Sequence, residues 1–283
     1  MGLVHGPPRL RSRCCEDGDA ISVATVTSID LRDPPVSARR VVAARVVAWV
    51  WAFVAAVPLF GLVDLGTLFG LSDSRYRWAM SLEASWGSLL TFFLAVGFAW
   101  VAIVPARPWP GFGLLVLATG SLVAAGVAFL DVGPLWLGPG FAAGAALVWA
   151  VLRPERPYVQ RGRPSVLAAV LGAVGVPLWL AYAALTYAAA RTAGAGEGDE
   201  TMGVDHWPVQ AALGLALAVG SAVLALVPAR LTLWRWAFAL TAGFVSYAAL
   251  VFPDRAGAMP HVLWAVGIAL WGVAVALAPR PRR

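Results

Sequence analysis

The sequence has no lysine and few charged residues of either sign. All 21 basic residues among the 283 are arginine, and charged residues account for only 13% of the chain. In soluble domains about a quarter of the residues are charged. Hydrophobic residues account for 60% of this chain and lie in long runs, a pattern typical of membrane helices. The shortage of charge therefore excludes an ordinary water-soluble domain.

Cysteine is almost absent too. Cys14 and Cys15 are the two cysteines, and adjacent cysteines are poorly placed to pair with each other, so a disulfide framework is excluded. The chain also has no CxxC, HExxH, Walker loop or GxSxG motif, which are the spacings of common metal, nucleotide and nucleophile sites. We therefore expect no metal and no cofactor, and an enzyme is the less favoured class.

The positive net charge does not indicate a nucleic-acid partner. The formal net charge is +6 and the isoelectric point is near 10.1, but the arginines stand at the ends of apolar runs, as the residues that set membrane topology do. We expect the lipid bilayer as the main partner and no nucleic acid. A second membrane protein or further copies of this chain remain open as additional partners.

Apolar runs long enough to cross the hydrocarbon core recur along the chain. Inside a membrane the backbone must satisfy its own hydrogen bonds, so each run predicts a helix. The predicted fold class is all-α, a polytopic membrane bundle of about eight transmembrane helices. Their predicted ranges are 46–65, 86–106, 111–130, 136–152, 166–190, 208–229, 236–252 and 261–278.

Arginine is distributed unequally between the two sides that these spans define. With the N-terminus inside the cell, 17 arginines fall in cytoplasmic segments and four fall outside. Such an excess indicates that the N-terminus and the C-terminus are both cytoplasmic. The absence of lysine and the abundance of alanine, glycine and valine are typical of a high-GC bacterial genome, so we expect the bacterial plasma membrane.

A stretch of the second predicted span returns in the sixth. Residues 94–107 and 217–230 are identical at ten of fourteen positions, and both end in Val-Pro-Ala-Arg. This repeat indicates duplication of a four-helix unit. An even number of helices gives both copies the same orientation, as in parallel-repeat transporters. The predicted organisation is a disordered cytoplasmic tail (1–40), a first four-helix membrane repeat (41–160) and a second (161–283).

Two prolines occupy corresponding positions inside apolar spans. Pro58 and Pro177 each lie in a Val-Pro-Leu triplet, and a proline inside a helix removes a hydrogen bond and kinks the helix. Each is a candidate helix kink. A hinge or an unwound binding segment is the functional interpretation. A fixed packing kink, which membrane helices tolerate, is the interpretation that we favour.

Asp205, His206 and His261 form the candidate polar site, at the predicted outer face. Imidazole and carboxylate groups there would bind a metal or move a proton. We favour a structural interpretation, in which Asp205 caps the sixth span and His261 opens the eighth. The two histidines also lack the spacing of a helical metal motif. No catalytic residue is assigned.

None of the predicted spans has an ionisable residue near its middle. Such residues mark proton and ion paths, so their absence disfavours an ion-coupled pump with a charged site at the centre of the membrane. We expect a permease for a neutral or lipid-like small molecule. The alternatives are a non-catalytic accessory subunit or sensor and, last, a membrane enzyme with a site at the outer face.

The arginine-bearing tail, the paired four-helix halves, the tryptophans at helix ends and the Pro-Ala-Arg turns resemble multi-pass integral membrane proteins of actinobacteria. The resemblance covers about residues 41–283 and is one of architecture. It implies a membrane bundle, and it implies no particular activity or site residue.

Overall fold

The computed structural model describes residues 38–70, 78–154, 166–193, 199–226 and 232–278. Within these ranges the chain is helical apart from one hairpin of two short strands, so the all-α prediction is confirmed as a fold class. Most of the predicted tail, with Cys14 and Cys15, lies outside the described residues. So does the Pro-Ala-Arg end of the second repeat copy, at 228–230.

Nine helices occupy the described ranges. One of them, Met80–Ile103, is continuous but passes through a wider π-helical segment, η1, between α3 and α4. Such segments are rare and frequently occur at functional sites. The bounds are α1 Ala38–Ala56, α2 Gly61–Gly70, α3 Met80–Ser88, η1 Leu89–Ala95, α4 Val96–Ile103, α5 Trp109–Phe129, α6 Val132–Leu152, α7 Val166–Thr192, α8 His206–Leu226, α9 Thr232–Val251 and α10 Val262–Leu277.

Several of these helices have the length and apolarity of membrane spans. Five qualify among the described residues: the Met80–Ile103 helix, α5, α6, α7 and α8. The pair α1 and α2, bent by 41° at a short break, makes a sixth when it is counted as one span. α9 is not in this set, and α10 has only 16 residues, fewer than the roughly 20 that a span needs. The protein is therefore an integral membrane protein, and the structure supports five to six of the eight predicted spans.

The second predicted span begins at Met80, six residues before the predicted start. Polar residues at 81, 83 and 85 lower the local hydropathy, which is why the sequence predicted a loop there. Ser81, Glu83 and Ser85 are nevertheless buried in the structure. Contacts with neighbouring helices, and not hydropathy alone, extend this helix.

The break between α1 and α2 surrounds Pro58. Proline has no N–H to donate and cannot continue a helix without losing a hydrogen bond. The chain turns at 57–60 and Phe60 takes a left-handed conformation (φ 62°) before α2 begins. α7, in contrast, continues through Pro177 as a single helix. The break redirects α2 so that it packs on α3.

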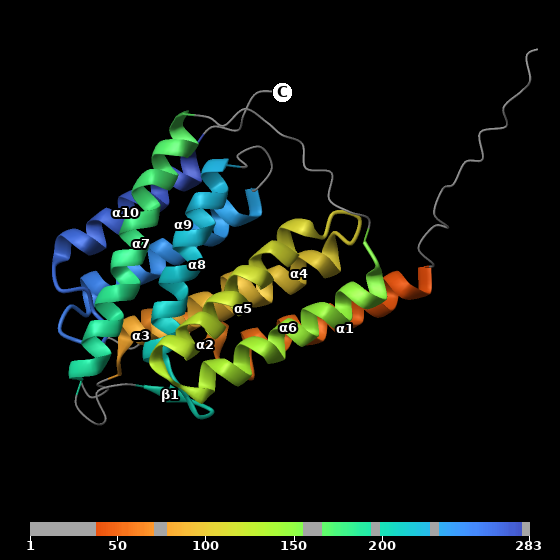
Figure 1. The fold of residues 1–283 in the computed structure, drawn as a ribbon, viewed down its shortest axis with the longest axis horizontal. Helices are drawn as coiled ribbons and strands as arrows, with labels where there is room; N and C mark the ends of the chain where they lie inside the picture. Colours follow the sequence, from red (N-terminus) through yellow and green to blue (C-terminus); the bar gives the residue numbers. More distant parts are fainter. Residues whose placement is uncertain (1–37, 71–77, 155–165, 194–198, 227–231, 279–283) are drawn as a thin grey trace, which may run out of the picture. The chain divides into compact units, whose positions relative to one another are not determined.

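The helices pack mainly as antiparallel neighbours. α5 packs on α6, α7 on α8 and α9 on α10, and α1 packs on both α4 and α6 (Figure 1). Three further contacts join the early helices to the late ones, since α5 packs on α8 and α3 packs on both α8 and α9. These contacts place α3 and α8 at the centre of the bundle.

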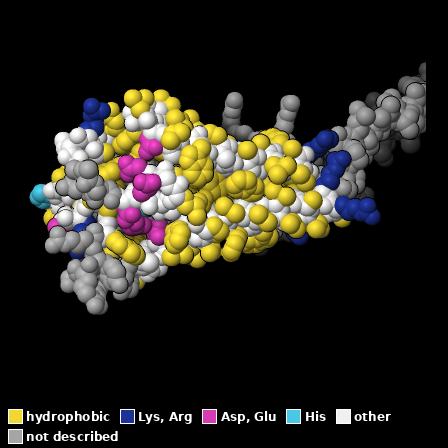
Figure 2. Space-filling model, turned by 90° about the horizontal axis from the view of Figure 1, so that it is seen from below, with side chains coloured by type: hydrophobic (Ala, Val, Ile, Leu, Met, Phe, Trp, Pro, Cys, Tyr) yellow, Lys and Arg dark blue, Asp and Glu magenta, His cyan; other side chains and the backbone are white. Residues whose placement is uncertain are grey.

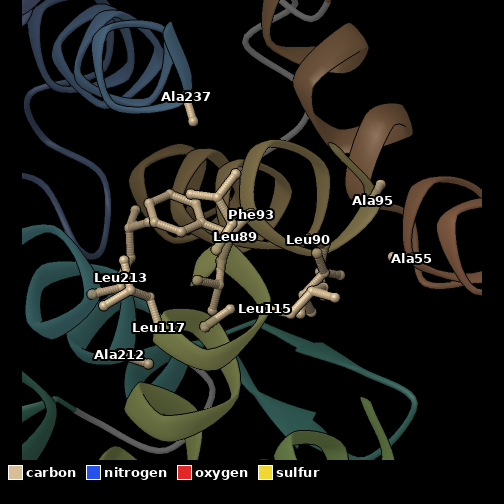
Figure 3. Packing of buried hydrophobic residues seen from close by; sticks show 14 of the residues in the cluster. Ala55, Leu89, Leu90, Phe93, Ala95, Leu115, Leu117, Ala212, Leu213 and Ala237 are labelled. Carbon is tan, nitrogen blue, oxygen red and sulfur yellow. The ribbon is translucent and has the colours of Figure 1, made fainter. Parts of the chain in front are cut away.

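The centre of the bundle is closed by large apolar side chains. Figure 3 shows Leu89 and Phe93 of η1 facing Leu213 of α8, with Leu117 of α5 beside them. The ring of Phe93 also stacks on that of Phe238 in α9, with 5.6 Å between the centroids. Side chains of this size fill the space between the central helices and exclude water.

The surface separates into two chemically different ends. Figure 2 shows aspartate and glutamate side chains gathered near one end, with some arginine among them, and arginine side chains alone at the other end, where α1 begins. Arg39, Arg40 and Arg45 are exposed there. We call these the acidic end and the basic end. Between them the visible surface is mostly hydrophobic, which suits contact with lipid tails.

Candidate functional site

Three ionisable side chains from two distant parts of the sequence meet near the acidic end of the bundle. Glu83 lies in the first turn of α3, His206 is the first residue of α8, and Asp199 directly precedes the strand β1 (Glu200–Thr201). One nitrogen or oxygen atom from each side chain lies within 4.8 Å of the others. We call these three residues the Glu–Asp–His cluster.

A short hairpin holds Asp199 beside His206. β1 pairs antiparallel with β2 (Val204–Asp205), and both turn residues, 202 and 203, have positive φ values of 54° and 78°. This is the turn that matches the twist of paired strands. The His206 N–H donates to the Asp199 carbonyl oxygen at 3.0 Å. Backbone pairing therefore continues past the strands and brings the two side chains together.

A fourth carboxyl group completes the acidic surroundings. The side chain of Asp64 in α2 lies close to that of Glu83, which in turn lies close to that of Asp199. Asp64 is 8% exposed and Glu83 is 7% exposed. The site therefore gathers carboxyl groups in a largely buried place.

The imidazole of His206 is completely buried. Its Nε2 atom lies 3.0 Å from the Thr201 hydroxyl, and its ring stacks on the indole of Trp86 with centroids 4.5 Å apart. Its Nδ1 atom lies 3.7 Å from Glu83 Oε1 and has no hydrogen-bond partner among the described residues. One ring nitrogen is therefore held by the hairpin while the other points, unpaired, at the carboxyl groups.

Trp86 is itself held by the break between α1 and α2. Its indole N–H donates to the carbonyl oxygen of Leu59 at 2.8 Å. Leu59 lies inside the break, where the turn presents this carbonyl to a neighbouring helix. The irregular backbone after Pro58 thus fixes the indole on which His206 stacks.

A hydrogen-bonded network adjoins the cluster on the same two helices. The Gln210 amide of α8 donates to the Tyr182 hydroxyl at 2.7 Å and to the Gly257 carbonyl at 2.8 Å. The Ser85 hydroxyl donates to the Ser81 carbonyl, so Tyr182 must donate to Ser85, 2.9 Å away. The direction of every hydrogen bond in the network is thereby determined. It joins α3 to α7, to α8 and to the loop before α10.

The remaining residues of the predicted polar site act at helix starts. At the start of α8, Asp205 Oδ1 accepts a hydrogen bond from the Trp207 N–H at 3.1 Å. At the start of α10, the exposed residue His261 is the N-cap, and its Nδ1 atom accepts a hydrogen bond from the Leu263 N–H at 3.1 Å. Partial burial raises the pKa of the Asp205 carboxyl above its usual value, against the opposing effect of the Trp207 hydrogen bond. Of the three predicted residues, only His206 belongs to the Glu–Asp–His cluster.

His261 lies instead beside a shallow hollow between α7 and α10. The hollow has a volume of about 290 Å³ and is lined by Leu178, His261, Leu263 and Trp264. Its lining is largely apolar. Nothing in it groups ionisable side chains as the Glu–Asp–His cluster does.

Buried hydroxyl groups continue from the cluster into the bundle. Ser81 and Ser88 share a helix face with Ser85 because they are spaced by four and three residues. The hydroxyls of Ser81, Ser88 and Thr91 are buried and have no hydrogen-bond partner, as are those of Thr241 and Ser246 in α9. Buried polar groups of this kind are usually satisfied by water. They lie in the Met80–Ile103 helix and in α9, where α3 packs on α9.

Sequence analysis did not identify Asp64, Glu83 or Asp199 as site residues. They lie in three segments predicted as spans or loops, and only the packing of α2, α3 and the hairpin brings them together. The sequence did contain one pattern that points to this site. Serines at 81, 85 and 88, with Glu83 between them, give an otherwise apolar helix a polar first part. A polar face of that kind needs partners inside the protein.

Comparison of the chain with protein-family models, with curated proteins and with solved structures gave no match in any of the three.

Proposed function

We propose that the protein is a permease for a neutral or lipid-like small molecule in the bacterial plasma membrane. It would have eight spans in two four-helix halves, residues 41–160 and 161–283. One observation carries the proposal. Near the acidic end the two halves meet through polar and ionisable side chains, with Glu83 of the first half 3.7 Å from His206 of the second. At the centre of the bundle they meet through apolar side chains.

The pattern of helix contacts supports two related halves. If α1–α2 corresponds to α7, the Met80–Ile103 helix to α8, α5 to α9 and α6 to α10, then most contacts occur in pairs. α5–α6 matches α9–α10, α1–α4 matches α7–α8, and α5–α8 matches α9–α3. Two contacts depart from this pattern, because α4 packs on α5 more extensively than α8 packs on α9, and α1 packs on α6 more extensively than α7 packs on α10. The paired contacts, with the repeat at 94–107 and 217–230, favour duplication.

Two polar contacts near the acidic end cross between the proposed halves. Glu83 meets His206, and Ser85 meets Tyr182. A permanent contact would be as stable with well-packed apolar side chains, since burying charged groups is costly. Polar side chains can instead form hydrogen bonds with water when the two halves separate, so they suit a contact that opens. We therefore interpret this region as a gate in its closed state.

The packed centre of the bundle favours an uncharged substrate. Leu89, Phe93 and Leu213 lie between the halves (Figure 3), and all three are 0% exposed. A charged solute would lose its hydration against such side chains at a cost of several kcal/mol. A neutral or lipid-like molecule would not. When the halves separate, the buried hydroxyl of Ser88 would be among the groups that become wet.

Thiol labelling tests whether water reaches the contact between the halves. The variant Ser88→Cys, made with Cys14→Ser and Cys15→Ser, is treated in membranes with a charged methanethiosulfonate. We expect it to react at least about tenfold faster than a thiol facing lipid, because only a hydrated thiol ionises and attacks. Reaction would be followed by mass spectrometry of the intact chain.

Two variants in the same background calibrate this measurement. Val219→Cys places a thiol on the exposed apolar surface of α8, where Val219 is 52% exposed, and Met202→Cys places one in the hairpin turn, where Met202 is 61% exposed. The first should stay unreactive and the second should react fully. If Ser88→Cys reacts no faster than Val219→Cys while the protein remains folded, the halves do not open and the permease proposal is wrong.

A membrane enzyme is the second candidate, and the Glu–Asp–His cluster favours it. An imidazole next to buried carboxyl groups provides a general acid and a general base within one site, and half-buried Asp199 gives access from the surface. The enzyme would convert a component of the bilayer. Lipid mass spectrometry of vesicles containing the wild type or Glu83→Gln tests this, because only the wild type should then change the lipid composition.

A further inference from the structure

We propose that Glu83, Asp199 and His206 bind one divalent first-row transition-metal ion, with Zn²⁺ as the probe. This inference goes beyond the proposed permease function and does not depend on it. It concerns metal binding by these three side chains, whereas the permease proposal concerns separation of the two halves. Asp64 is positioned to take part as a fourth carboxyl group through its contact with Glu83.

The donor set suits such an ion. Imidazole nitrogen and carboxylate oxygen together are preferred by Zn²⁺ and its first-row neighbours, whereas Ca²⁺ and Mg²⁺ take oxygen ligands almost alone. With metal–ligand distances of about 2.0–2.2 Å, the ligand atoms of a tetrahedral site lie about 3.4 Å apart. The three donors lie within 4.8 Å of one another, and His206 Nδ1 is already 3.7 Å from Glu83 Oε1. Small side-chain rotations would complete the site.

Two buried atoms point to a ligand independently of the acidic cluster. His206 is 0% exposed, yet its Nδ1 atom has no hydrogen-bond partner, and Asp64 is 8% exposed with Oδ2 unpartnered. Leaving a buried polar atom unpaired costs about 1–3 kcal/mol. His206 Nδ1 faces Glu83, so an ion placed between them would use the free lone pair of the imidazole.

The surroundings of His206 match those of a metal-binding imidazole. Such a histidine usually donates its other ring N–H to an oxygen, which sets the tautomer and the ring orientation. Here Nε2 lies 3.0 Å from the Thr201 hydroxyl, and donation of an Nε2 proton to that oxygen would leave the Nδ1 lone pair for the ion. The stacked indole of Trp86 holds the ring plane. Both contacts orient the imidazole before any ion arrives.

Charge balance also favours a cation. Asp64, Glu83 and Asp199 bring three carboxyl groups together. Among the described residues, the basic side chain beside them is that of His206, 3.7 Å from Glu83. Burial of several carboxylates in one place requires positive charge or protons. A divalent ion would supply that positive charge and would tie α3 to α8 and the hairpin.

Zinc competition with a fluorescent chelator tests this proposal on the full chain. The protein carries Cys14→Ser and Cys15→Ser, because thiols bind zinc, and is purified in detergent without a polyhistidine tag after treatment with EDTA. We expect one Zn²⁺ per chain. His206→Asn and Glu83→Gln should each weaken binding at least about tenfold, the scale of losing part of a metal site.

Matched variants separate loss of a ligand from loss of the fold. Asp205→Asn and His261→Asn change neighbouring helix caps and should bind as the unsubstituted background does. Asp199→Asn removes a half-buried ligand outside the helices, so it remains informative if Glu83→Gln fails to fold. Absence of zinc binding by the background protein, or full affinity in folded His206→Asn and Asp199→Asn, would overturn the proposal. The Ser88→Cys labelling is done in EDTA, so the failure of either proposal leaves the other measurable.

Discussion

At the scale of residues, capping accounts for two of the three polar side chains that stood out in the sequence. Asp205 and His261 accept backbone N–H groups two residues ahead, at the starts of α8 and α10. The first N–H groups of a helix have no partner inside it, so a side-chain acceptor there stabilises the helix. His206 differs, because it is buried and its side chain contacts other elements. Position next to a cap therefore does not decide a residue's role.

Substitution of Asp205 separates its cap from its charge. Asp205→Ala removes the acceptor of the Trp207 N–H and should cost about 1 kcal/mol of stability. Asp205→Asn keeps an acceptor and removes a charge that partial burial penalises, so it should match or exceed the wild type at neutral pH. Thermal unfolding in detergent, followed by circular dichroism, measures both.

The pH dependence of the same pair gives a second test. The folded pKa of Asp205 lies above the ordinary value of 3.8, so the folded state binds this proton more tightly than the unfolded state does. That stabilisation is complete below pH 3.8 and is lost as the pH rises through the folded pKa. The wild type should therefore lose stability relative to Asp205→Asn between pH 3.8 and neutrality. An unchanged difference over this range would contradict the raised pKa.

At the scale of elements, two glycines one turn apart in α6 have different surroundings. A Cβ atom at Gly144 would lie 2.5 Å from the indole of Trp51 in α1, whereas one at Gly140 would meet nothing within 4 Å. Trp51 also packs against Phe141, with centroids 5.4 Å apart. The close approach of α1 to α6 therefore requires glycine at 144 and leaves 140 unconstrained.

Alanine at each position tests this difference. Gly144→Ala should lower stability by about 1–3 kcal/mol, because the indole or the helix must shift to admit the methyl group. Gly140→Ala should leave stability unchanged or raise it slightly, since alanine is the better helix former. The two midpoints of thermal unfolding in the same detergent give the comparison. Equal midpoints would mean that α1 and α6 do not pack as closely as the structure has them.

At the scale of the whole molecule, the separation of acidic and basic ends suggests how the protein lies in the membrane. Arginines concentrate on the cytoplasmic side of membrane proteins, and Arg39, Arg40 and Arg45 are exposed at the end where α1 begins. The Glu–Asp–His cluster and its hairpin lie near the other end. We therefore propose that the cluster faces the outside of the cell.

Labelling of intact cells with an impermeant thiol reagent measures this orientation. Met202→Cys in the hairpin turn should react in intact cells, and Ala106→Cys, in the exposed connection between α4 and α5, should react only after the cells are broken. Both carry Cys14→Ser and Cys15→Ser. The opposite pattern would place the cluster in the cytoplasm and reverse the proposed topology.

The fold was more predictable than the site, for a physical reason. Helices in a membrane follow from long apolar runs, which are local properties, and the described helices lie close to the predicted ranges. The largest differences were at Ala38, where the first helix begins well before the predicted start at 46, at Met80, where buried serines and Glu83 extend the helix, and at Pro58, where the first span breaks. The contact of Glu83 with His206 joins residues more than a hundred positions apart, and no local pattern predicts it.

What the sequence alone determined is the class of molecule: a chain so rich in apolar runs and so poor in charge must satisfy its backbone as helices within lipid. It also determined which end carries arginine. Only the tertiary structure decided which polar groups act together. The break after Pro58 redirects α2 and Asp64, the hairpin sets Asp199 beside His206, and the packing of α3 on α8 buries Glu83 against them. Burial and proximity are properties of the packed bundle, and they bring ordinary helix-end residues together as the proposed metal site.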